Sequence, residues 1–299
     1  MNKKVAVFGL GSMGSGVARS LLRAGFEVHG FDVVADSVER FVNDGGHAGD
    51  STRPPAGLGL VVSVVLNAAQ TEAVLFGDGA PGGGMVARLE PGSVVVSCAT
   101  VAPGFARHMA TRCEAERVAY LDAPISGGAA RAKAGRLTVL ASGSSAAFER
   151  ARPALDAMAE TVFPLGEAPG LGSAMKAVNQ LLAGVHIAAM GEAMVFGMSQ
   201  GIEPGQLVEV ISRCAGTSWM FENRAPHVVD GDYTPRSAVD IWLKDLAIVL
   251  DIAKDANLPT PLAANSLMRF IAAAGAGLGA EDDAAVAKIY ARECGVTLP

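Results

Sequence analysis

Short apolar runs, many of them rich in β-branched residues, alternate with helix-like segments through the first half of the chain. The runs cover residues 5–8, 26–32, 58–66, 94–98, 117–121, 137–141 and 161–165. Segments with helical spacing, such as 15–24 and 147–159, lie between them. A continuous apolar run such as 58–66 is typical of a parallel strand that is covered on both faces. The alternation therefore predicts an α/β fold with a doubly wound sheet.

The pattern changes after Gly166. Residues 174–199 predict one long helix, and the remainder has helical spacing that is interrupted at Gly201, Gly216, Gly231 and Pro259. We therefore expect two domains, residues 1–166 and 167–299, the second of them all-helical. Because the long helix is apolar nearly all round, we expect it to be buried between lobes or between subunits. Polar residues within it, such as Asn179, make it a poor membrane span.

Composition narrows the class of protein. The chain has 299 residues, of which 50% are hydrophobic and 18% charged, and this indicates a globular protein with ample core. A net charge of −6 without basic runs argues against nucleic-acid binding. The 4 cysteines form no C-x-x-C pair, so neither a disulfide framework nor a metal site is expected. The first strand starts too near residue 1 for a targeting segment, and we expect a cytoplasmic protein. Residues 81–84 predict a flexible loop.

A glycine-rich turn joins the first strand to the first helix. It reads Gly9-Leu10-Gly11-Ser12-Met13-Gly14, which is the G-x-G-x-x-G spacing. In this setting the glycines allow a tight turn, close approach of the backbone to a pyrophosphate, and close packing of helix on strand. The N–H groups at the helix N-terminus attract phosphate. The segment therefore predicts a Rossmann-type domain that binds a nicotinamide dinucleotide.

Asp32 ends the second predicted strand. It follows the glycines at close to the ~20 residues expected for a carboxylate that accepts hydrogen bonds from ribose hydroxyls. A 2′-phosphate requires a cation at this place, whereas Val33, Val34 and Ala35 follow Asp32. NAD is therefore favoured over NADP. Arg40 is the nearest cation in the sequence, and we interpret it as a solvated helix residue.

Further polar segments follow later strands. Residues 66–68 and 97–100 come at the carboxyl ends of predicted strands, where doubly wound sheets bind their ligands. Residues 122–128 read Asp-Ala-Pro-Ile-Ser-Gly-Gly. The turn at 126–128 either converges backbone N–H groups on an anion such as a carboxylate, or is an ordinary turn after a proline.

Lys176 lies in the first turns of the long helix, with Asn179 at i+3 and Gln180 at i+4. A lysine here can exchange a proton with a substrate hydroxyl if burial or a neighbouring positive charge lowers its pKa. The alternative is an ordinary surface lysine. Taken alone, the pair Lys244-Asp245 indicates a solvated helix face, and residues 218–221 indicate core packing.

Four motifs carry a family resemblance. They are residues 7–14, 122–128, 176–180 and 244–246. In this order and spacing they resemble the β-hydroxyacid dehydrogenases, a family related to 3-hydroxyisobutyrate dehydrogenase. The match runs from residue 3 to about residue 290. The resemblance implies an NAD-dependent dehydrogenase that acts on the CH–OH group of a small hydroxy acid.

The resemblance also implies a role for each motif residue. Lys176 is the expected proton carrier, and Asn179 and Gln180 are expected to bind substrate. The substrate carboxylate is expected at Ser126, Gly127 and Gly128. The cofactor is expected to contact Gly9, Leu10, Gly11, Ser12, Met13, Gly14, Asp32, Leu66, Asn67, Thr100 and Lys244. No metal is implied.

Several alternatives stay open within this interpretation. We expect a four-carbon sugar acid as substrate, with tartronate semialdehyde and 3-hydroxyisobutyrate as alternatives. A catalytically inactive dinucleotide-binding module and an imine reductase share the architecture, but a lysine at 176 argues against both. Because an uncovered apolar helix would leave a large exposed patch, we expect a homodimer or homotetramer. Neither nucleic acid nor membrane is an expected partner.

Overall fold

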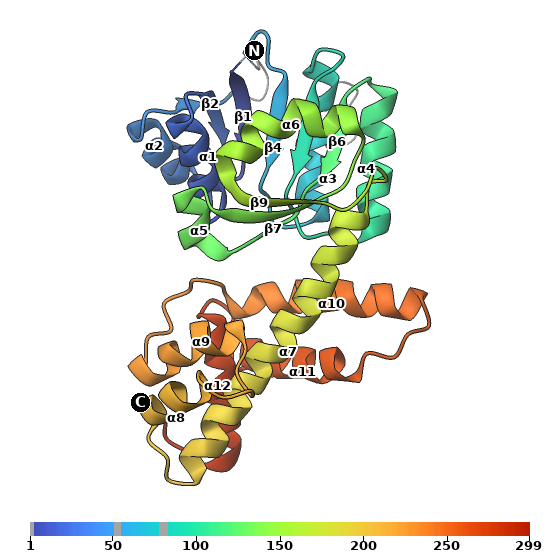
Figure 1. Cartoon of the computed structure of the whole chain (residues 1–299). Coiled ribbons are helices and arrows are strands. Elements are labelled where there is room, and N and C mark those ends of the chain that lie inside the picture. The colour runs from blue at the N-terminus through green and yellow to red at the C-terminus, as the bar shows by residue number, and fades with distance from the viewer. Residues whose placement is uncertain (1–2, 51–54, 78–82) are drawn as a thin grey trace. The chain divides into compact units, whose positions relative to one another are not determined.

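The computed structural model describes residues 3–50, 55–77 and 83–299, so part of the loop expected at 81–84 lies outside the described residues. The chain divides into two compact units (Figure 1). The first, here the N-terminal unit, covers residues 1–176, and the second, the helical unit, covers residues 177–299. The sequence places the domain boundary earlier, after Gly166, because the alternation of strands and helices ends there and helical spacing follows.

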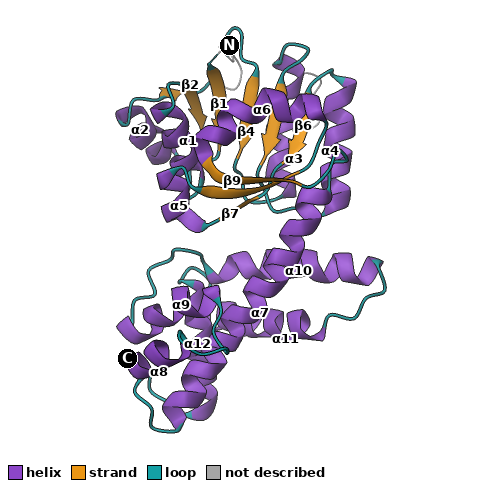
Figure 2. Ribbon diagram, in the orientation of Figure 1, coloured by secondary structure: helices purple, strands orange, loops and turns teal. Residues whose placement is uncertain are grey.

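A six-stranded parallel sheet forms the centre of the N-terminal unit, with helices on its two faces (Figure 2). Its strand order is β3-β2-β1-β4-β5-β6. The strands are β1 (Lys4–Phe8), β2 (Glu27–Phe31), β3 (His47–Ala48), β4 (Leu60–Ser63), β5 (Val94–Ser97) and β6 (Ala119–Asp122). The order reverses direction between β1 and β4, which is the point where such sheets bind ligands. The predicted doubly wound sheet is confirmed.

Helices and alternating strand residues build one core layer on each face of this sheet. The helices are α1 (Gly14–Arg23), α2 (Ala35–Asn43), α3 (Ala68–Phe76), α4 (Pro103–Ala115), α5 (Gly128–Ala134) and α6 (Ser145–Met158), with a short 3₁₀ turn η1 (Val86–Arg88). Successive strand side chains point to opposite faces. Accordingly, Val7 packs in one cluster with Leu21 of α1, whereas Phe8 packs in another with Leu75 of α3 and Met109 of α4.

A second, three-stranded sheet differs from the sequence interpretation. It consists of β7 (Ile125–Ser126), β8 (Leu137–Ala141) and β9 (Ala159–Pro164), with β7 antiparallel and β9 parallel to β8. The sequence predicts that the runs at 137–141 and 161–165 belong to the doubly wound sheet. In the structure they form strands of the second sheet instead. The chain between β7 and β8 is shorter than the dozen or so residues that a parallel crossover requires, so these two strands pair antiparallel.

Six longer helices, the first of which begins in the N-terminal unit, form the helical part that follows. They are α7 (Leu171–Ser199), α8 (Pro204–Ile211), α9 (Trp219–Asp230), α10 (Val239–Asp255), α11 (Pro261–Ala273) and α12 (Val286–Cys294), with short turns η2 (Ala274–Leu278) and η3 (Asp283–Ala285). Buried side chains such as Met190, Trp242 and Phe270 fill the core. Gly231, one of the predicted breaks, ends α9 in the left-handed conformation that glycine adopts without strain.

Helix α7 is long and apolar enough to cross a membrane by length and composition, and half of its most apolar window is buried inside the protein. A core helix has the same properties. Its first two turns, up to Lys176, belong to the N-terminal unit, and the rest belongs to the helical unit.

Candidate functional site

The glycine-rich turn lies between β1 and α1, at the point where the strand order reverses. A Cβ on Gly9 would lie 2.5 Å from the Val64 carbonyl oxygen, and one on Gly14 would lie 1.8 Å from the Gly9 oxygen. These two glycines are required by packing. A Cβ on Gly11, in contrast, would meet nothing within 4 Å. The open space at Gly11, next to the start of α1, is what a pyrophosphate needs in order to approach the backbone, so these residues fit a dinucleotide.

Asp32 is fixed beside this turn by backbone hydrogen bonds. Leu10 N donates to Asp32 Oδ2 at 2.6 Å, and Val34 N donates to Oδ1 at 2.9 Å. Each carboxylate oxygen retains a further acceptor site, because an ionised carboxylate accepts about four hydrogen bonds. The structure thus brings Asp32 to the glycine-rich turn, where both of its carboxylate oxygens are anchored to backbone N–H groups.

The strand-end residues occupy the same edge of the sheet. Asn67 caps α3, its side-chain oxygen accepting from Gln70 N at 2.9 Å, and the half-exposed Leu66 donates its N–H to Gln70 Oε1 at 2.8 Å. Thr100 follows β5 and is partly exposed. Helix capping alone accounts for the orientation of Asn67.

Lys176 and the turn at 126–128, which are far apart in the sequence, meet in the N-terminal unit. Lys176 is buried, and its Nζ donates to the Ile125 carbonyl oxygen at 2.9 Å. Ile125 directly precedes Ser126, and Gly127 and Gly128 have φ values of 127° and 75°. This left-handed backbone favours glycine, and turns of this kind can form anion-binding concavities. An amine and a set of backbone donors therefore lie next to each other.

Asp122 lies behind this pair and has a structural role that the sequence alone did not indicate. It is 1% exposed, and its carboxylate accepts from Gly170 N at 2.9 Å, Ser173 N at 2.8 Å, Ser173 Oγ at 2.7 Å and Ser142 Oγ at 3.3 Å. Burial raises the pKa of Asp122 above its usual 3.8, against the lowering effect of these hydrogen bonds. Asp122 thus ties the end of β6 to the first turn of α7, one turn before Lys176. The feature of the sequence that could have identified Asp122 is its position at the start of the 122–128 motif.

Asp245 holds a second cluster, in the helical unit. Gln180 Nε2 donates to Asp245 Oδ2 at 2.5 Å, and Lys244 Nζ lies 2.5 Å from Asp245 Oδ1. Asn179 Nδ2 in turn donates to Gln180 Oε1 at 2.8 Å. Asp245 is 3% exposed, so the pair Lys244-Asp245 is not the solvated helix face that the sequence alone indicates. The sequence alone indicated no role for Asp245 at the site, because its burial depends on packing between separate helices.

Two further expectations concern residues outside these clusters. Ser218 is the N-cap of α9, where its Oγ accepts from Phe221 N at 3.0 Å, and Phe221 is buried in the core. In the described ranges 3–50, 55–77 and 83–299, no group of three or more His, Cys, Asp or Glu residues is arranged to hold a metal ion.

Family models cover nearly the whole chain. Residues 4–166 match the NAD binding domain of 6-phosphogluconate dehydrogenase. Residues 170–290 match the model described as NAD-binding of NADP-dependent 3-hydroxyisobutyrate dehydrogenase.

Individual relatives extend over the full chain. L-threonate dehydrogenase of Cupriavidus necator is 49% identical, and the alignment covers 100% of this chain and 99% of the relative. L-threonate dehydrogenase of Escherichia coli is 46% identical over 99% of this chain and 96% of the relative. A crystal structure of 3-hydroxyisobutyrate dehydrogenase from Salmonella typhimurium superposes with a TM-score of 0.89 at 46% identity, and covers 96% of this chain and 99% of that chain.

Proposed function

We propose that this chain, which belongs to the β-hydroxyacid dehydrogenase family, oxidises L-threonate to 2-dehydro-L-erythronate with NAD as the hydride acceptor. It is a nicotinamide-dinucleotide-dependent dehydrogenase that acts on the CH–OH group, as its motifs predict. The substrate assignment is supported by the names of its relatives. It is also supported by segments 180–189, 218–224 and 232–240, which resemble L-threonate dehydrogenases.

The observation that carries the proposal is the hydrogen bond from Lys176 Nζ to the carbonyl oxygen of Ile125, at 2.9 Å. It places the amine one residue from Ser126, in the turn of Ser126, Gly127 and Gly128 that we propose holds the substrate carboxylate. In a 2-hydroxy acid the reacting carbon is bonded to that carboxylate. An amine adjacent to a carboxylate site therefore lies near the hydroxyl that must lose its proton.

The reaction divides between residues and cofactor. A bound NAD supplies the hydride acceptor for the hydrogen on C2. Lys176 Nζ accepts the proton of the C2 hydroxyl, which leaves the 2-oxo acid as product. Asn179 and Gln180 donate or accept hydrogen bonds with the substrate, and the contact of Gln180 with Asp245 fixes its amide. Fixing the amide in advance reduces the entropy lost on binding.

The cofactor site consists of the glycine-rich turn and the strand-end residues. The segment Gly9–Gly14 binds the pyrophosphate. Asp32 accepts hydrogen bonds from the ribose hydroxyls, and its negative charge disfavours a 2′-phosphate. The other proposed contacts come from Leu66, Asn67, Thr100 and Lys244. We propose NAD over NADP because the carboxylate of Asp32 is held rigidly beside the turn by Leu10 N and Val34 N.

We propose a cytoplasmic homodimer or homotetramer. Three large apolar side chains of α7 remain 49–67% exposed within one chain, namely Val178, Leu182 and Phe196, and a second copy would cover them. All four cysteines are free thiols, which suits a reducing compartment. Light scattering of the purified protein measures the number of subunits, and a monomer would contradict the oligomer.

NADH formation with a panel of hydroxy acids tests the proposed reaction. The panel contains L-threonate, D-erythronate, glycerate, 3-hydroxyisobutyrate and 3-hydroxypropionate, each with NAD and with NADP. We expect the highest kcat/KM with L-threonate and NAD. Activity with glycerate but not threonate would instead assign the chain to the tartronate-semialdehyde reductases. Preference for 3-hydroxyisobutyrate would match the description of the Salmonella structure.

A further inference from the structure

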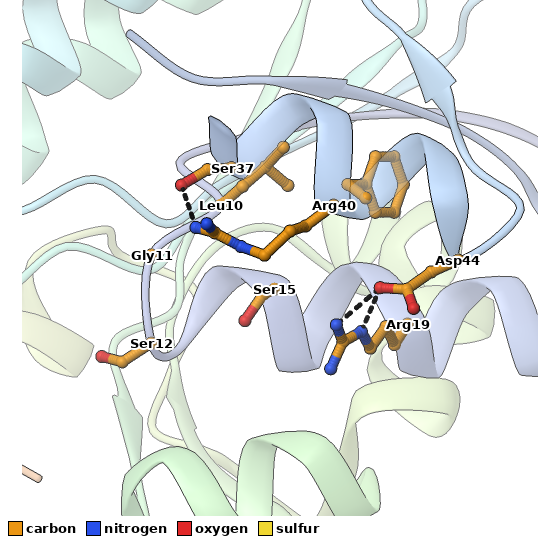
Figure 3. A pocket seen from close by; sticks show the side chains of 9 residues that line it. Leu10, Gly11, Ser12, Ser15, Arg19, Ser37, Arg40 and Asp44 are labelled. Carbon is orange, nitrogen blue, oxygen red and sulfur yellow. Dashed lines mark hydrogen bonds and ion pairs between the residues drawn. The ribbon is translucent and has the colours of Figure 1, made fainter. Parts of the chain in front are cut away.

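Two arginines of the N-terminal unit lie beside turns that the proposed function uses. Arg40 borders a pocket of about 230 Å³ next to the glycine-rich turn, and Figure 3 shows its guanidinium group turned toward Leu10 and Gly11. That pocket is part of the proposed cofactor site. Arg131, on α5, lies instead beside the turn at 126–128, to which the proposed function assigns the substrate carboxylate. The charge of Arg131 therefore acts where the substrate is expected.

The side chain of Arg131 packs across Gly127, the middle residue of this turn. A Cβ on Gly127 would lie 2.8 Å from Arg131 Cδ and 3.1 Å from Arg131 Cβ. Gly127 is the N-cap of α5, and residues four apart lie on the same face of a helix, so the methylene stem of Arg131 covers the turn. The guanidinium group is two bonds beyond Cδ. Packing of the stem thus holds a positive charge next to the turn.

This positive charge is only partly neutralised. Among the residues that the structure describes, the carboxylate within ion-pair distance of Arg131 is that of Glu160 on β9, with Arg131 Nη1 4.0 Å from Glu160 Oε2. Glu160 has a closer partner, because Arg136 Nη2 and Nε donate to its Oε1 at 2.8 and 3.1 Å. Two arginines thus share one carboxylate, and the group keeps one positive charge in excess. Arg131 is the member of the group that packs on the turn.

The order of the charges favours an anion at the turn. Ser126 pairs with Thr138 of β8, which pairs in turn with Thr161 of β9, the residue after Glu160. Glu160 is therefore two strand spacings, or about 10 Å, from Ser126. Arg131 extends from the turn toward Glu160, so its guanidinium group lies between them. An anion bound at the turn is consequently nearer to the positive charge than to the negative one.

From this arrangement we propose that Arg131 is a specificity-determining residue that favours negatively charged substrates, and that Glu160 limits the strength of this effect. The inference rests on the proposed function, in which the turn holds the substrate carboxylate. Backbone N–H groups of a turn bind an anion but carry no net charge. Arg131 adds a charge that attracts the substrate without touching the reacting carbon. Because this attraction is the same for the bound substrate and the transition state, it lowers KM and leaves kcat unchanged.

A series of charges at position 131 tests this with L-threonate and saturating NAD. At low ionic strength, Arg131→Gln is expected to lower kcat/KM about 2- to 5-fold, which corresponds to one unit charge acting over roughly 4–10 Å in water. Arg131→Glu doubles the change of charge and should lower kcat/KM about 4- to 25-fold. Arg131→Lys should restore the wild-type value. In each variant we expect the loss in KM and not in kcat.

The dependence of kcat/KM on ionic strength is the diagnostic measurement, because a merely structural role of Arg131 would not alter it. Salt should lower kcat/KM of the wild type, lower that of Arg131→Gln less, and lower that of Arg131→Glu least. Equal salt dependence in all three proteins would overturn the proposal. A fall in kcat at unchanged KM would also overturn it, since Arg131 would then act on the chemical step.

Two further variants serve as controls. Lys133→Gln removes the same charge from α5, but residues two apart do not face each other on a helix, so KM and the salt dependence should stay unchanged. Glu160→Gln should act in the opposite direction and raise kcat/KM, and it tests the proposal even if an Arg131 variant does not fold. A lower kcat/KM in Glu160→Gln would contradict the limiting role of Glu160. Wild-type protein that forms NADH with no hydroxy acid would overturn the proposed function, whereas active wild type with unaltered variants would overturn only the role of Arg131.

Discussion

The N-terminal and helical units satisfy their buried polar groups in different ways. At the site of the N-terminal unit the partners are backbone atoms: the partly buried Asp32 accepts from Leu10 N and Val34 N, and Lys176 donates to Ile125 O. In the helical unit the buried Asp283 has side-chain partners. Arg224 Nε lies 2.5 Å from Asp283 Oδ1, and Trp242 Nε1 donates to Asp283 Oδ2 at 2.9 Å.

This difference has a consequence for substitution. A backbone partner persists whatever residue supplies it, so a change in the N-terminal unit removes one chemical group and leaves its partner able to bind water. A side-chain partner in a dry core is unique, and its loss leaves a buried charge unpaired. We therefore expect substitutions at the site of the N-terminal unit to affect function first, and those in the core of the helical unit to affect stability first.

The largest effect is expected for Lys176→Ala, which removes the proposed proton carrier. We expect kcat for L-threonate oxidation to fall about 10²- to 10⁴-fold, the contribution of general acid–base catalysis. NADH binding should remain nearly intact. Stopped assays of NADH formation and fluorescence titration of NADH measure the two quantities. Lys133→Ala, an exposed lysine on α5, is the matched control. A Lys176→Ala enzyme with substantial turnover would contradict the assigned role.

The next effect is expected for Arg224→Ala in the helical unit. Asp283 is 0% exposed, and losing its arginine leaves a buried charge that costs about 3–5 kcal/mol of unfolding free energy. Arg236→Ala breaks only a half-exposed pair with Asp232 and should cost much less. Denaturant unfolding, with hydrogen exchange in α9 and α10, measures both. Equal losses of unfolding free energy in the two variants would contradict the expectation that the buried pair matters more than the exposed pair.

A smaller effect is expected for Gly11→Ala in the N-terminal unit. Because a Cβ at Gly11 would meet nothing within 4 Å, we expect the melting temperature to be unchanged. The methyl group should occupy the space of the pyrophosphate and raise the NADH dissociation constant about tenfold, or about 1.4 kcal/mol. Gly205→Ala, an equally open glycine in α8 of the helical unit, should leave binding unchanged. A stable Gly11→Ala protein with normal NADH affinity would contradict the proposed cradle.

The smallest effect is a difference in pH dependence between the units. Burial alone raises the pKa of Asp282, but hydrogen bonds from Arg236 N and His227 hold it below its usual 3.8. Its stabilisation is therefore present at neutral pH and is lost as pH falls through the folded-state pKa. The raised pKa of Asp122 has the opposite sign, since the folded protein gains relative stability as this group becomes protonated.

Unfolding free energies between pH 7 and about 3 test these signs. Asp282→Asn should flatten the acid decline of stability, and Asp122→Asn should steepen it. Identical pH slopes for both variants and the wild type would contradict the directions of the two shifts.

Features that depend on local sequence patterns could be predicted, and contacts between separate elements could not. The Rossmann-type sheet, the glycine-rich turn and the helical second half depend on local patterns, and all three are confirmed. The family and its dehydrogenase chemistry are confirmed as well, because they rest on motifs that are contiguous in the chain. The roles of the individual site residues remain predictions.

The sequence by itself determined which residues can do chemistry: the glycines that leave room for a phosphate, the acid at the end of β2, and a lysine in an apolar helix. Only the tertiary structure decided their partners. Lys176 meets Ile125, Gln180 meets Asp245, and Arg40 turns toward Leu10 and Gly11. These contacts join residues on separate elements, whereas propensity and periodicity describe neighbours along one element. The second sheet was missed for the same reason, since strand pairing depends on the length of the connection as well as on the apolar run.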